Sequence, residues 1–110
     1  SYFYGIYKST VVMCRRALQL ALEDKMPGAA EKRLTLGPLI EKAQEQTPPL
    51  LGAQSYSLAL GIKDFGDAGA HRKEVIEAEA ARMVLVVTGR VLNELYSPSA
   101  TQSGQGSNAP

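Results

Sequence analysis

The sequence predicts an all-α protein, an up-and-down bundle of four to five helices. Two long segments, residues 4–24 and about 74–96, carry this prediction, because their apolar residues recur every three to four positions. Two shorter segments with helical spacing lie between them, at 38–47 and about 50–64. One run that resembles a buried strand, residues 83–89, continues the helical period on both sides and is therefore interpreted as helix.

The composition is that of a globular protein of one domain. The 110 residues are 45% hydrophobic and 21% charged, and 12 basic against 11 acidic side chains give a net charge of +1. This balance gives no reason to expect a nucleic acid or a membrane as partner. One cysteine excludes an internal disulfide, and no apolar run reaches the ~20 residues that span a bilayer. With no signal peptide visible, we expect a cytoplasmic protein.

The first helix has a single apolar stripe with polar residues on its other side. The residues of the stripe are Tyr4, Tyr7, Val11, Cys14, Leu18 and Ala21. Cys14 lies within this stripe, so we interpret it as a small buried hydrophobe rather than a nucleophile. Pro27 and Gly28 end the helix, because proline disfavours helical geometry in the residue before it and glycine favours a C-terminal turn.

The two middle helices are delimited by prolines. Pro38 begins the first of them, since its missing N–H costs nothing there, and Thr47 with the two prolines after it closes the helix. The segment 50–64 has an apolar face made of Leu51, Tyr56, Leu58, Ala59 and Ile62. Gly52 and Gly61 weaken it, at ~1 kcal/mol each relative to alanine.

The last helix has an unusually wide apolar face, with two adjacent rows. One row is Ala80, Val84, Val87, Val91 and Leu95, and the other is Ala81, Leu85, Thr88, Leu92 and Leu95. So wide a face should be covered on more than one side, which favours a homodimer or a partner domain. We assign residues 1–96 to the bundle and residues 97–110, which are small and polar, to a flexible tail or linker.

The segment 62–71 is the first place to look for chemistry. It contains the only histidine, His71, beside Gly66, Asp67 and Gly69, and its glycines permit close approach or positive φ. His71 would act as general acid and base or as a recognition residue; the alternative is a histidine that packs between helix ends. A metal site from Asp64, Asp67, His71 and Glu74 has only one histidine and unordered acids, so we expect no metal and no other cofactor.

Taken together, several elements resemble the HEPN superfamily of small helical-bundle domains. They are Arg15-Arg16-Ala17-Leu18 on the first helix, Leu36-Gly37-Pro38-Leu39-Ile40, Gly66-Asp67-Ala68-Gly69-Ala70-His71 after the third helix, and an alanine-rich closing helix. The closest likeness is to an uncharacterised branch found beside restriction and abortive-infection proteins of phage defence. The resemblance implies a four- or five-helix bundle that often dimerises.

Catalytic members of that superfamily are metal-independent ribonucleases that use an arginine, the polar residue after it, and a histidine four positions further on. By this resemblance the histidine is His71 and the polar residue is Asp67, while the arginine position falls on Gly66. Lys63, Arg15 or Arg16 would have to supply the cation, and lysine is a poorer clamp for phosphate than arginine.

We therefore expect a non-catalytic interaction or dimerisation domain, in which Arg15, Arg16 and His71 are the binding residues. The alternative is a ribonuclease toxin in which His71, Lys63 and Asp67 are catalytic and RNA is the ligand. Either arginine could instead pair with Asp64 or Asp67 and hold the segment around His71 in place.

Overall fold

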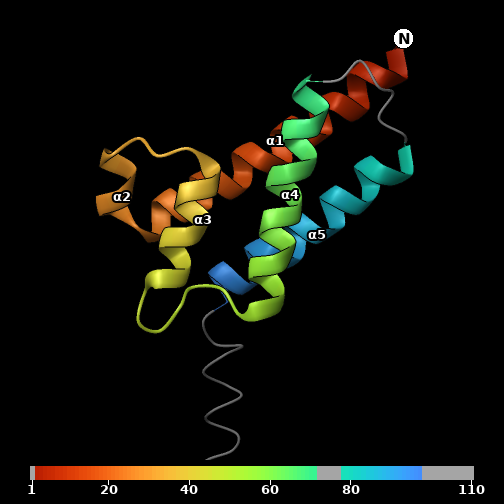
Figure 1. Ribbon diagram of the computed structural model, residues 1–110. Coiled ribbons are helices and arrows are strands. Elements are labelled where there is room, and N and C mark those ends of the chain that lie inside the picture. The colour runs from red at the N-terminus through yellow and green to blue at the C-terminus, as the bar shows by residue number, and fades with distance from the viewer. Residues whose placement is uncertain (1, 72–77, 98–110) are drawn as a thin grey trace, which may run out of the picture.

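The structure is a computed structural model that describes residues 2–71 and 78–97, and the side chains of residues 5–65 and 78–97. The described residues form five helices and no strand, so the predicted all-α fold is confirmed (Figure 1). The helices are α1 (Tyr2–Lys25), α2 (Pro27–Glu31), α3 (Leu36–Glu45), α4 (Ala53–His71) and α5 (Ala78–Tyr96). No described helix is both long and apolar enough to cross a lipid bilayer.

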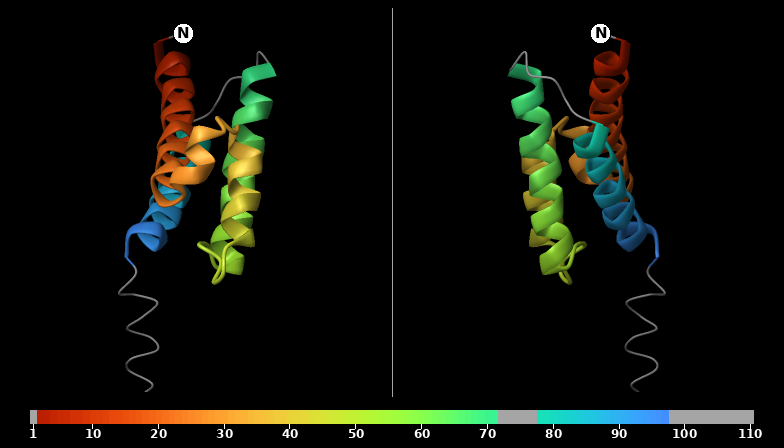
Figure 2. Two further views of the ribbon diagram at one scale, coloured as in Figure 1. Left: turned by 90° about the vertical axis from the view of Figure 1, so that its left-hand side faces the viewer. Right: turned by 90° about the vertical axis from the view of Figure 1, so that its right-hand side faces the viewer.

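The four longer helices form two layers, α1 with α5 and α3 with α4 (Figure 2). Helix α1 is central, because it packs against each of the other four. Helices α1 and α5 run in the same direction. Near their C-terminal ends the Tyr96 hydroxyl donates to Asp24 Oδ2 at 2.8 Å, and Lys25 Nζ lies 4.6 Å from the centre of the Tyr96 ring.

The core consists of two clusters. The larger one joins parts of all five helices, and its completely buried members include Leu18, Leu39, Ile40 and Val91. The smaller one lies between the first halves of α1 and α5 and consists of Val11, Cys14, Ala81 and Val84, with Phe65 of α4 packed against it. Four residues of the predicted α1 stripe, Val11, Cys14, Leu18 and Ala21, are thus buried, and Tyr7 is half-buried; the side chain of Tyr4 lies outside the described residues. Cys14, at 3% exposure, is a core residue as expected.

Helix α2 is an element that the sequence pattern did not predict. Helix α1 does end at Lys25, as expected, but Pro27 then begins a new helix of five residues. Proline suits this first helical position, where an N–H would have no partner within the helix. Only Ala29 of α2 is buried, so there is no periodic apolar face to indicate this helix.

Helix α3 begins at Leu36 rather than at Pro38. Its first turn is closed by the Leu39 N–H, which donates to the Thr35 carbonyl at 3.2 Å. Pro38 is therefore the third helical residue, a position whose N–H also lacks a partner in any helix, so the proline is accommodated.

Helix α4 extends beyond its predicted end near Asp64 and reaches His71. Its backbone is helical through Gly66 and Gly69, which the sequence analysis placed in a segment between helices. Glycine lowers helix stability by ~1 kcal/mol but does not forbid helical φ and ψ, so the helix continues through both positions.

The N-terminus of α4 is held by α5. Helix α4 has no acidic residue in its first turn, and Gly52, which precedes it, has no side chain with which to cap it. Glu94 of α5 takes this role, since it accepts from the Gly52 N–H at 2.6 Å and from the Ser55 hydroxyl at 3.0 Å. A carboxylate at a helix N-terminus also interacts favourably with the helix dipole.

Candidate functional site

The three residues of the predicted catalytic set share one continuous helix. Lys63, Asp67 and His71 follow one another at intervals of four along α4, so their Cα atoms lie on one face of it. The structure therefore corrects the expectation of a separate segment around His71. The side chains of Asp67 and His71 lie outside the described residues, so their contacts and their catalytic or binding roles stay predictions.

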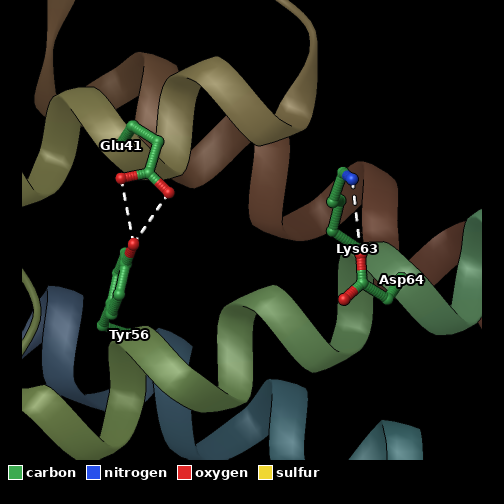
Figure 3. Close-up of polar contacts among 4 residues, drawn as sticks. All are labelled: Glu41, Tyr56, Lys63 and Asp64. Carbon is green, nitrogen blue, oxygen red and sulfur yellow. Dashed lines mark hydrogen bonds and ion pairs between the residues drawn. The ribbon is translucent and has the colours of Figure 1, made fainter.

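Lys63 is packed between α4 and α3. Its alkyl chain covers Gly37, where an added Cβ would lie 3.2 Å from Lys63 Cε, so α3 can approach α4 this closely because residue 37 is glycine. Lys63 Nζ forms an ion pair with Asp64 Oδ1 at 3.3 Å (Figure 3). Phosphate would have to compete with this carboxylate for the ammonium group.

A tyrosine–carboxylate contact links the same two helices. The Tyr56 hydroxyl of α4 donates to both carboxylate oxygens of Glu41 in α3, at 2.9 and 2.7 Å (Figure 3). The hydrogen bond to Glu41 raises the pKa of Tyr56 above its ordinary value of 10.0, because ionisation would place two anions together. The contact is therefore present at neutral pH and is lost as the pH rises through this raised pKa.

The two arginines of α1 differ in burial. Arg15 is half-buried and its Nε is shielded from solvent, whereas Arg16 is exposed. Of the pair, Arg15 is thus the interior residue and Arg16 the one accessible to a ligand. Pairing of either arginine with Asp64 or Asp67 stays a prediction, as does their role in binding.

The structure adds no metal centre to the described part of the chain. Among the side chains it describes, no group of three or more histidine, cysteine, aspartate or glutamate residues lies close enough to hold an ion. Of the four residues considered above, only the side chain of Asp64 is described; Asp67, His71 and Glu74 lie outside the described side chains.

The most distinctive surface feature is apolar and lies on α1 and α5. Among the side chains that the structure describes, the strongly exposed large hydrophobic ones all belong to these two helices: Ile6, Val12, Met13 and Leu20 on α1, and Met83, Leu85, Val86 and Tyr96 on α5. We give the name α1–α5 surface to five of these side chains, Met13, Leu20, Met83, Leu85 and Val86; each of the five is at least half exposed.

The sequence pattern placed only part of this surface correctly. Leu85 belongs to one of the two predicted apolar rows of the last helix and is 55% exposed, while its row neighbours Ala81 and Thr88 are buried. Met83 and Val86 belong to neither predicted row. The signal that could have found them is the unbroken apolar run of residues 83–87, which is too wide for one helix face to bury.

An apolar groove lies beside this surface, between α4 and α5. It has a volume of about 230 Å³ and is lined mainly by Leu58, Ile62, Phe65, Met83, Val84 and Val87. Met83 belongs to both the groove and the α1–α5 surface, so the two are continuous. A lining with so few polar groups is suited to apolar contacts and offers little for acid–base chemistry.

Comparison with known proteins places the chain in a family. Residues 1–107 match the model of a family described as a domain of unknown function, DUF4145. The chain belongs to the DUF4145 family. No curated protein and no solved structure matches it. Membership in DUF4145 brings no activity, ligand or partner with it, so a function must be argued from the surfaces described above.

Proposed function

We propose that this DUF4145 chain is a non-catalytic interaction domain that forms a homodimer, or docks a partner domain, through the α1–α5 surface. The observation that carries the proposal is that, within the described side chains, the strongly exposed large hydrophobic ones lie on two helices of one layer. Isolated exposed apolar residues are normal on a monomer, but an apolar surface gathered on neighbouring elements is typical of protein–protein contact.

The resemblance to HEPN domains supports the proposal, since bundles of that superfamily often dimerise. It extends the proposal to a HEPN-like domain that acts in the cytoplasm within a phage-defence or nucleic-acid-processing system. Burying apolar side chains against a second surface contributes about 25 cal/mol for each Å² removed from water, which gives the contact its driving force.

A variant with the surface made polar tests this proposal. Met13, Leu20, Met83, Leu85 and Val86 are replaced together by glutamine, a good helix former, so that the helices are retained. We expect unchanged far-ultraviolet circular dichroism and cooperative thermal unfolding, but loss of association in sedimentation equilibrium. A folded variant that associates as strongly as the wild type would contradict the proposal.

One observation favours a competing function, a metal-independent ribonuclease that uses His71. The continuity of α4 puts Lys63, Asp67 and His71 on one face of one helix. However, Lys63 and His71 lie two turns apart, about 12 Å along the axis, and Lys63 already pairs with Asp64. We therefore expect no metal-free cleavage of RNA by the purified protein. Cleavage that disappears in a folded His71→Ala variant would establish the ribonuclease instead.

A further inference from the structure

Four exposed residues form a stripe along α5. They are Glu79, Met83, Val86 and Arg90, which are spaced four, three and four residues apart. This is the spacing of alternating d and a positions in a heptad repeat, so the four side chains lie along one line of the helix. Met83 and Val86 are 62% and 58% exposed, and both charged residues are exposed as well.

The order of chemistry along this α5 stripe is self-complementary. An acid stands at its N-terminal end, two apolar residues in its middle and a base at its C-terminal end. Two such stripes can meet in opposite directions, with the two-fold axis passing between Val84 and Leu85. Glu79 then faces Arg90 of the second copy, and Met83 faces Val86 of the second copy. Each of these two contacts, the charged pair and the apolar pair, occurs twice in the dimer, as two-fold symmetry requires.

We propose that a second copy of this chain binds to the α5 stripe, with the two α5 helices antiparallel and the Glu79–Arg90 pair formed twice between copies. This inference rests on the proposed function and names the part of the α1–α5 surface that makes the dimer. The antiparallel arrangement follows from the charges, because a parallel pair would place Glu79 against Glu79 and Arg90 against Arg90.

The surroundings of the stripe suit a helix as its occupant. Gly89, beside Arg90, has open space around its Cα, so no side chain there keeps a second helix away. Met83 also lines the apolar groove, so a helix on the stripe extends the contact towards Val87 and Leu58. An interface made of only four pairs of facing side chains is small. Its buried area is at or below the ~1,200 Å² of weak complexes, so we expect the dimer to have a dissociation constant in the micromolar range.

Charge reversal tests the arrangement. In Glu79→Arg and in Arg90→Glu, both symmetric pairs become repulsive, so we expect each variant to dimerise about tenfold more weakly than the wild type. The double variant Glu79→Arg/Arg90→Glu restores both pairs and should regain wild-type affinity. Glu45→Arg, on the exposed side of α3, is the matched control and should leave dimerisation unchanged.

A mixture of the two single variants gives the sharpest readout. One copy then carries two arginines and the other two glutamates, so a heterodimer has two attractive pairs while each homodimer has two repulsive ones. With differently labelled copies, fluorescence-detected sedimentation should show heterodimers at concentrations where each variant alone is monomeric.

The outcomes separate this inference from the proposed function. If the wild type dimerises and neither reversal nor mixing changes its affinity, the α5 stripe is not the interface, and the proposed function stands with another part of the α1–α5 surface. If the wild type remains monomeric at high micromolar concentration, self-association and the α5 pairing are both wrong.

Discussion

Replacing Leu18 by alanine lowers the free energy of unfolding by about 3 kcal/mol, a large part of the 5–15 kcal/mol typical of a domain. Leu18 is completely buried in the larger core cluster, on the helix that packs against all the others. The alanine leaves a cavity among the other residues of this cluster, which come from all five helices, and a packed core collapses only in part around such a cavity. Urea unfolding followed by circular dichroism measures the loss.

Leu20→Ala is the matched control for this prediction. It makes the same chemical change two residues further along α1, at a side chain that is 50% exposed. Because Leu20 belongs to the α1–α5 surface, both variants are measured at a concentration where the chain is monomeric; there Leu20→Ala should cost about 0.5 kcal/mol or less, in the range of surface substitutions. Equal losses in the two variants would show that the layers are not packed as described.

Removal of the Glu94 carboxylate gives the second large effect. Glu94→Ala leaves the Gly52 N–H and the Ser55 hydroxyl without their acceptor, and Ser55 is only 7% exposed. Hydrogen bonds to charged groups contribute about 1.5–3 kcal/mol, so we expect a loss of about 2 kcal/mol in the free energy of unfolding. Glu45→Ala, an exposed glutamate of α3, should change it by less than about 0.5 kcal/mol.

A double-mutant cycle shows whether Glu94 acts through α4. Since Ser55 and Glu94 share one contact, Ser55→Ala/Glu94→Ala should cost less than the sum of the two single variants. Amide hydrogen exchange should also accelerate first at residues 53–56, where the helix begins. Strict additivity, together with uniform exchange, would contradict the capping role of Glu94.

Periodicity was sufficient to predict the fold class and the long helices. The buried residues Val11, Cys14, Leu18 and Ala21 lie on the predicted stripe of α1, and Val84, Val91 and Leu95 lie on a predicted row of α5. Each of these helices buries one face in the core, and such a face leaves a period of 3.6 residues in the sequence.

The features that the sequence left open depend on contacts between distant residues. Glu94 and Gly52 are far apart in the chain, so no local capping pattern indicates their hydrogen bond. The end of α4 was placed too early because glycines were interpreted as a break, although glycine can adopt helical φ and ψ. The sequence predicted that the apolar face of α5 is too wide, but which part stays exposed is decided by where α1 and α4 lie.

The mass of the wild-type protein in solution tests the central claim most directly. Sedimentation equilibrium across the micromolar range should show a concentration-dependent shift from the mass of one chain to twice that mass, because the α1–α5 surface has no cover within the described part of one copy. A single-chain mass over the whole range would contradict self-association through this surface.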